Sequence, residues 1–174
     1  MKMQTDSQDC FALFGLPPRF AIDLGQLDMA FRRLQSELHP DRHVRHDEME
    51  RRIALQLSTR VNDAYQTLRK PASRAQCLID MAEEKTCNTL SHRFLMLQME
   101  WREEIECASN KGDHVALVKL AHRLQNAMRE HERKLADALD MRSDFQNAAL
   151  LVNELRFYER LRIEINDALD QLEN

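Results

Sequence analysis

Glycine and proline are scarce in this chain. It has 174 residues but only three glycines and four prolines, and all four prolines lie within the first 71 residues. The rest of the sequence is rich in Leu, Glu, Ala, Arg and Met, which favour helices, and lacks the residue that most often breaks them. No stretch of useful length shows the apolar–polar alternation of a strand. The sequence therefore predicts an all-α protein.

A net positive charge is also absent. The formal charge is −4, with −1 over residues 1–84 and −3 over residues 85–174. Neither half therefore has the positive field of a nucleic-acid-binding protein. No apolar run approaches the ~18 residues of a membrane span, and the N-terminal stretch MKMQTDSQDC lacks the apolar core of a signal peptide. We expect a cytoplasmic protein that binds neither nucleic acid nor membrane.

The four cysteines form no CxxC pair. Their spacing suggests neither a zinc site nor a disulfide framework, which fits a reducing compartment. We therefore expect a protein that needs no metal or other cofactor. The cysteines are Cys10, Cys77, Cys87 and Cys107.

The first half of the chain predicts four helical segments. The stretch CFALFGLPP predicts a short helical turn that ends at Gly15. Asp23 and Gln26 have the spacing of a capping box and open a helix, which ends before Pro40 because a residue preceding proline is pushed out of helical geometry. A second long helix is expected over about residues 47–69, and another begins at Pro71. Apolar stripes predict that the two long helices form an antiparallel pair: Leu27, Phe31, Leu34 and Leu38 in one, and Ile53, Leu57, Val61, Ala64, Tyr65 and Leu68 in the other.

The second half of the chain predicts three helical segments after a linker at residues 84–90. The middle segment is the most regular, because its apolar residues alternate at spacings of four and three, as in the seam of an antiparallel bundle. Its stripe is Leu117, Ala121, Leu124, Met128, His131, Leu135 and Ala138. A histidine in such a stripe is a hydrogen-bonded core or edge residue in most proteins and a ligand in few.

The stretch ELHPDRHVRH joins the two long helices of the first half. Three interpretations compete for His39, Pro40 and Asp41. They could form a structural turn, a catalytic pair in which Asp41 orients His39, or, with His43 and His46, a metal site. No nucleophile or oxyanion motif completes a catalytic site, and no thiol or convincing carboxylate set completes a metal site.

The surroundings of this corner favour a fourth interpretation, which is recognition of another protein. A loop at the tip of two packed helices is well placed to meet a partner. Arg32 and Arg33 precede the corner, and Arg42 and Arg45 follow it. Their positive charge suits an acidic protein surface.

Roughly residues 9–80 contain, in order, a helix, HPD, a loop, a helix that carries VNDAYQTL, and then KPASRA. This order of segments resembles that of the J-domain of DnaJ-like co-chaperones. The resemblance implies a surface that binds a DnaK-like chaperone and stimulates its ATP hydrolysis, with no catalytic group in this chain. Two positions depart from many relatives, because Leu38 replaces a tyrosine and His43 replaces a phenylalanine. The implied chaperone-binding residues are His39, Pro40, Asp41, Arg32, Arg33 and Arg42.

The stretch FLMLQMEWREEIEC has two apolar faces when drawn as a helix. At 100° per residue, one face holds Phe94, Leu97, Trp101, Ile105 and Ala108, and we expect it to face the bundle core. Leu95, Met96 and Met99 lie nearly opposite, beside Glu100 and Glu103. This second face is either covered within the chain or kept open for a partner.

This half resembles the C-terminal bundle of the HscB family, the dedicated co-chaperones of iron–sulfur cluster biogenesis. The resemblance rests on FLM followed by ME and REE, a later LRF, and the opening FALFGLP. It implies an L-shaped molecule whose J-domain recruits an HscA-type chaperone and whose bundle binds an IscU-type scaffold protein. Cys107 departs from the family, which has an acidic residue one turn after Glu103. The implied scaffold-binding residues are Leu95, Met96, Met99, Glu100, Glu103 and Phe157.

These observations predict a J-domain over residues 1–83, a linker at 84–90 and a scaffold-binding bundle over 91–174. The expected function is that of a co-chaperone, not an enzyme, which delivers the scaffold to the chaperone and promotes cluster transfer. Two alternatives remain open. One is a J-domain co-chaperone for a different client, and the other is a cluster- or metal-handling enzyme that uses His39, His43, Cys107 and neighbouring histidines.

Overall fold

The computed structural model describes residues 7–38, 48–84, 86 and 91–173. Within these ranges the chain is helical and has no strand, as expected. It divides into two compact units, Met1–Glu83 and Glu84–Asn174. None of the described helices is both long enough and apolar enough to cross a membrane.

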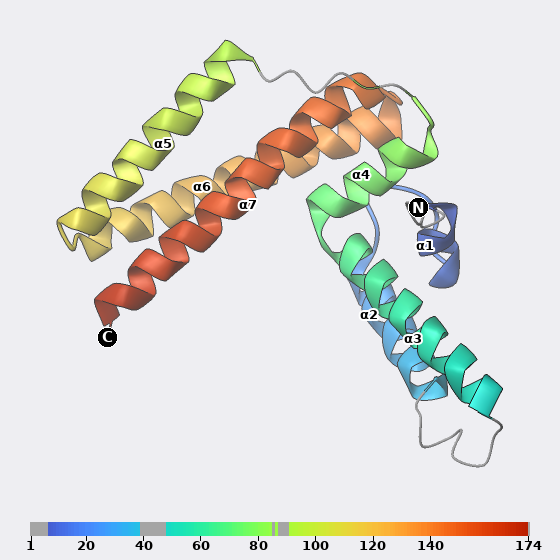
Figure 1. Cartoon of the computed structure of the whole chain (residues 1–174). Coiled ribbons are helices and arrows are strands. Elements are labelled where there is room, and N and C mark those ends of the chain that lie inside the picture. The colour runs from blue at the N-terminus through green and yellow to red at the C-terminus, as the bar shows by residue number, and fades with distance from the viewer. Residues whose placement is uncertain (1–6, 39–47, 85, 87–90, 174) are drawn as a thin grey trace. The chain divides into compact units, whose positions relative to one another are not determined.

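The first unit is built on two helices that lie side by side, α2 (Leu24–Glu37) and α3 (Glu48–Arg69) (Figure 1). The carboxylate of Asp23 begins α2, because it accepts hydrogen bonds from the backbone N–H groups of Gly25 at 2.8 Å and Gln26 at 3.2 Å. Such a cap satisfies donors that have no partner inside the helix. The predicted start of this helix is therefore confirmed.

Two shorter helices complete this unit, α1 (Ser7–Leu13) and α4 (Pro71–Met81). Gly15 ends the turn after α1 with a φ of 65°, a conformation that suits glycine. Arg74 of α4 is buried, donates a hydrogen bond of 2.6 Å to the carbonyl of Leu68, and lies 4.8 Å from the ring centroid of Phe20. Arg74 therefore ties the start of α4 to the last turn of α3.

The predicted core stripe of α3 is only partly buried. Val61, Ala64 and Leu68 are buried, but Ile53 is 47% exposed and Leu57 is 39% exposed. The amide of Gln35 on α2 donates to the amide oxygen of Asn62 on α3 at 3.5 Å, which sets the antiparallel register. In this register, residues 53 and 57 lie beyond Glu37, the last residue of α2, so α2 does not cover them. The prediction that they are core residues was wrong.

The second unit is a bundle of three helices: α5 (His92–Asn110), α6 (His114–Ala136) and α7 (Phe145–Glu173). Gly112, with a φ of 63°, forms the tight turn between α5 and α6, and Asp113 then caps α6 by accepting from the N–H of Ala116 at 2.9 Å. A π-helical turn at Asp137–Met141 follows α6 and was not predicted.

The seam predicted for α6 is confirmed. Leu117, Leu124, Met128, His131, Leu135 and Ala138 are buried, and Ala121 is half-buried. The Nδ1 atom of His131 is 3.0 Å from the carbonyl oxygen of Ala127, and its Nε2 atom is 2.7 Å from a carboxylate oxygen of Glu154 on α7. His131 is therefore a hydrogen-bonded core residue, as expected.

Candidate functional site

The His-Pro-Asp corner lies outside the described residues. This holds for His39, Pro40, Asp41 and Arg42 of the predicted chaperone-binding set, and for His43 of the alternative metal site. Among the described ranges, no three His, Cys, Asp or Glu side chains come together as metal ligands. Arg32 and Arg33 are described, and both are exposed on α2.

A polar network holds α2 against α3 close to these two arginines. One carboxylate oxygen of Asp28 accepts hydrogen bonds from the Tyr65 hydroxyl at 2.8 Å and from the Arg69 guanidinium at 2.7 Å. The hydrogen bond from Tyr65 and the positive charge of Arg69 hold the pKa of Asp28 below its usual range. The ring of Tyr65 also stacks on Phe31, with ring centroids 3.9 Å apart. This network fixes the part of α2 that carries Arg32 and Arg33.

The two apolar faces predicted for the FLMLQMEWREEIEC segment are present on α5. Ser91 caps this helix through a hydrogen bond of 3.1 Å from the N–H of Phe94. On the inner face, Phe94, Trp101, Ile105 and Ala108 are buried, and Leu97 is half-buried. The expected core face of this helix is therefore confirmed.

The outer face of α5 is open. Leu95 is 45% exposed, Met96 46% and Met99 57%, and the carboxylate residues Glu100 and Glu103 beside them are exposed as well. No helix of the bundle covers these residues. Of the two interpretations of this face, the structure therefore excludes burial within the bundle. These five residues are called the α5 surface below.

Phe157 does not belong to this surface. It is only 1% exposed, and its ring meets the ring of Phe94 edge-on at a centroid distance of 5.6 Å. The helix α7 packs against both α5 and α6, so it buries a wide arc of side chains. Phe157 lies on the part of that arc that meets α5. The expectation that Phe157 completes the exposed patch is corrected: it supports Phe94 from inside.

A second contact fixes the C-terminal half of α5. The guanidinium carbon of Arg123 on α6 lies 3.9 Å from the ring centroid of Trp101, and its Nη1 atom is 2.8 Å from a carboxylate oxygen of Glu104. One cation thus binds two side chains of α5, one turn apart. Sequence reasoning missed Arg123, because nothing in the local pattern of α6 indicates which residues of α5 it meets.

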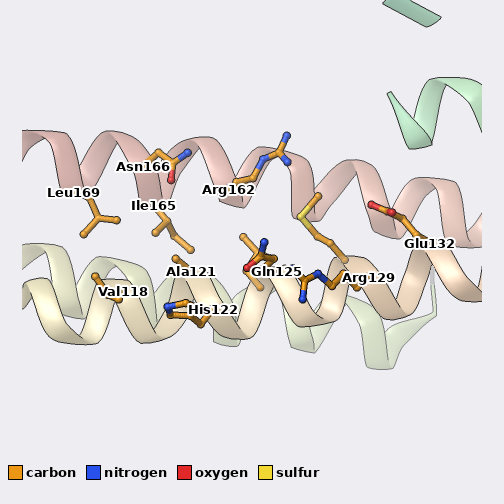
Figure 2. A pocket seen from close by; sticks show the side chains of 12 residues that line it. Val118, Ala121, His122, Gln125, Arg129, Glu132, Arg162, Ile165, Asn166 and Leu169 are labelled. Atoms are coloured by element: carbon orange, nitrogen blue, oxygen red, sulfur yellow. The ribbon is translucent and has the colours of Figure 1, made fainter. Parts of the chain in front are cut away.

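A hollow lies between α6 and α7 (Figure 2). Its lining includes Ala121, Met128 and Ile165, with Arg129 on α6 and Arg162 on α7, and it includes no residue of α5. None of the predicted site residues lines this hollow. Substitutions in this hollow can therefore serve as controls for substitutions in the α5 surface.

Similarity to known proteins extends over nearly the whole chain. Residues 90–166 match the family model described as the HSCB C-terminal oligomerisation domain. A co-chaperone protein HscB homolog of Aromatoleum aromaticum is 45% identical over 170 residues, covering 95% of this chain and 96% of the relative. A homolog with the same description from Azoarcus sp. is 46% identical over 171 residues, covering 96% of this chain and 97% of the relative.

Solved structures of HscB proteins are also similar to this chain. The chaperone HscB from Vibrio cholerae is similar with a TM-score of 0.86 at 35% identity, covering 94% of this chain and 98% of the other. The human co-chaperone protein HscB is similar with a TM-score of 0.83, covering 95% of this chain and 83% of the other, and at 24% identity it supports the fold alone.

Proposed function

Because the chain belongs to the HscB family, the co-chaperones of iron–sulfur cluster biogenesis, we propose that it is an adaptor with two binding sites. One site engages a DnaK-like chaperone of the HscA type, and the other holds a scaffold protein of the IscU type. The adaptor promotes cluster transfer and the maturation of iron–sulfur proteins. It works in the cytoplasm, with no active site or cofactor of its own.

The proposed chaperone site lies in the first unit and consists of His39, Pro40, Asp41, Arg32, Arg33 and Arg42. Its sequence order is that of a J-domain, which supports this assignment. Arg32 and Arg33 add support, because both are exposed on a helix that the contacts of Asp28 and Phe31 hold in place. Exposed cations steer an acidic partner and speed its association. ATP hydrolysis takes place in the partner, so this site contributes binding energy and no catalytic group.

The proposed scaffold site is the α5 surface. The observation that carries it is the exposure of Leu95, Met96 and Met99 on a helix whose opposite face is buried. An apolar group of this kind, flanked by carboxylates, is typical of a surface that binds another protein. Methionine side chains adapt to the shape of a partner, and Glu100 and Glu103 favour a partner with positive charge opposite them. Phe157 acts indirectly, by supporting Phe94 beneath the surface.

Two sites on one chain raise the concentration of the scaffold near the chaperone. Once the chain has bound both proteins, capture of the scaffold no longer requires a free encounter in solution. Stimulated ATP hydrolysis then closes the chaperone on the scaffold. The co-chaperone acts by bringing its partners together, so its function requires binding and no catalytic pocket.

The test measures ATP hydrolysis by the HscA-type chaperone, with and without the IscU-type scaffold. We expect His39→Gln to abolish the stimulation while scaffold affinity stays unchanged. The triple variant Leu95→Ala, Met96→Ala and Met99→Ala should keep the basal stimulation but lose the scaffold-dependent increment. Ile163→Ala is the matched control, because Ile163 is 58% exposed on α7 and lies outside the α5 surface.

Two results would contradict this proposal. If His39→Gln still stimulates the chaperone, the corner is not the chaperone site. If the folded triple variant binds the scaffold as tightly as the parent chain, the α5 surface serves a different client.

A further inference from the structure

A hollow of about 550 Å³ lies between the C-terminal half of α5 and the N-terminal half of α6. Glu103, the last residue of the α5 surface, is part of its lining, together with Glu104, Cys107, Lys111, Lys119 and Arg123. The hollow therefore continues the α5 surface without a break. A partner that lies along α5 and passes Glu103 arrives at this hollow.

The hollow adds positive groups next to the acidic α5 surface. Glu100 and Glu103 make the α5 surface acidic, whereas Lys111 and Lys119 line the hollow and are exposed. The carboxylate of Glu104 is bound to Arg123 at 2.8 Å, and that of Asp113 accepts the N–H of Ala116 at 2.9 Å. Neither lysine forms an ion pair with any residue that the structure describes. Two positive groups are therefore available to a partner.

Helix stability does not account for both lysines. Lys111 follows the last turn of α5, where a cation favourably meets the negative end of the helix dipole. Lys119 is the sixth residue of α6, near the positive end, where the dipole gives a cation no stabilisation. Position 107 holds an exposed thiol in place of the acidic residue that the HscB resemblance implies. That exchange removes a carboxylate one helical turn before Lys111 from the lining of the hollow.

We propose that the scaffold-binding surface extends past Glu103 into this hollow, where Lys111 and Lys119 bind an acidic side chain of the scaffold protein. This inference rests on the proposed function of the α5 surface and adds a second contact of opposite sign. Carboxylates at one end, and at the other two lysines that pair with no described residue, favour one direction of a partner along α5, because the reversed orientation places like charges together. Lys111 and Lys119 are then specificity-determining residues.

The experiment measures the affinity of the whole chain for the IscU-type scaffold, with the variant Lys111→Glu and Lys119→Glu, at low and high salt. We expect affinity to fall about tenfold at low salt and less at high salt, because exposed charges are screened. The control is the double variant Arg129→Glu and Arg162→Glu, which reverses two exposed charges in the α6–α7 hollow, to which α5 contributes nothing (Figure 2). It should change affinity less than about twofold at either salt concentration.

The possible outcomes separate this inference from the function on which it rests. If Leu95→Ala, Met96→Ala and Met99→Ala weakens binding and the lysine variant does not, the hollow is not part of the interface, while the scaffold site stands. If neither variant weakens binding, the scaffold site itself is wrong. A compensating Asp→Lys or Glu→Lys change in the scaffold that restores affinity for the lysine variant identifies the acidic side chain. Equal losses for the lysine variant and the double arginine variant would overturn the inference, because both change the net charge by the same amount.

Discussion

The guanidinium group of Arg123 covers the ring of Trp101, with 3.9 Å between the guanidinium carbon and the ring centroid. It reaches from α6 to α5 and also binds Glu104. This contact joins the helix that carries the proposed scaffold site to the rest of the bundle. It also gives the chain a natural probe, because Trp101 is its only tryptophan.

Replacing Arg123 should loosen α5 without unfolding the bundle. We expect Arg123→Ala to lower the free energy of unfolding by about 1 kcal/mol, the sum of a partly exposed cation–π contact and a surface ion pair. The emission of Trp101 should shift to the red, because its ring gains contact with water. Urea unfolding monitored by fluorescence measures both effects. Arg129→Ala, which removes an arginine from the same helix, should produce neither.

Substitutions of Phe157 and Met99 should have different effects, the first on the stability of the bundle and the second on scaffold binding. Phe157→Ala removes a buried ring, and we expect it to cost about 3–5 kcal/mol of unfolding free energy. Met99→Ala removes an exposed side chain, so it should change stability by less than about 0.5 kcal/mol and still weaken scaffold binding. Circular dichroism during thermal unfolding, paired with calorimetric titration of the scaffold, checks both variants. A stable Phe157→Ala chain would contradict the buried position of this ring.

His131 should contribute to the stability of the bundle through Glu154. The carbonyl of Ala127 can only accept a hydrogen bond, so Nδ1 of His131 must donate to it, and Nε2 meets the carboxylate. His131→Ala leaves a cavity and removes the partner of a half-buried carboxylate, which should cost about 2–4 kcal/mol. Denaturant unfolding measures the loss. His122→Ala, at an exposed position on the same helix, should have little effect.

Asp28 should make the first unit sensitive to acid. The hydroxyl of Tyr65 and the guanidinium of Arg69 hold its pKa in the folded chain below the usual value of 3.8. The folded state therefore binds a proton less readily than the unfolded state, and the resulting stability is present at neutral pH. It is lost as the pH falls below that value and through the lowered pKa. Asp28→Asn should lower the melting temperature at pH 7.

The difference in melting temperature between Asp28→Asn and the parent chain should depend on pH. The difference between Asp28→Asn and the parent chain should shrink as the pH falls below about 4, where the parent carboxylate also takes up a proton. Thermal unfolding at a series of pH values measures it. Asp63→Asn, an exposed change on α3, is the control. A difference that stays constant from pH 7 to pH 2 would show that the charge of Asp28 does not stabilise the fold.

The sequence alone determined the helices and most of their inner faces. The helix starts at Asp23 and Pro71 depend on residues close together in the chain, and so does the stripe that includes Leu117 and Leu124. Such local patterns can be read without coordinates. The two faces of α5 followed from the same periodicity. The resemblance to the HscB family also needed only the order of residues, and the comparisons bear it out.

Only the tertiary structure decided which of these faces are covered. Phe157 is buried because α7 meets a second helix there, whereas Ile53 and Leu57 are exposed because α2 ends before it reaches them. Two further features join residues of different helices. One is the contact between Arg123 and Trp101, and the other is the hollow lined by Lys111, Lys119 and Glu103. Periodicity describes each helix by itself, so it cannot tell which side chain of a neighbouring helix lies opposite.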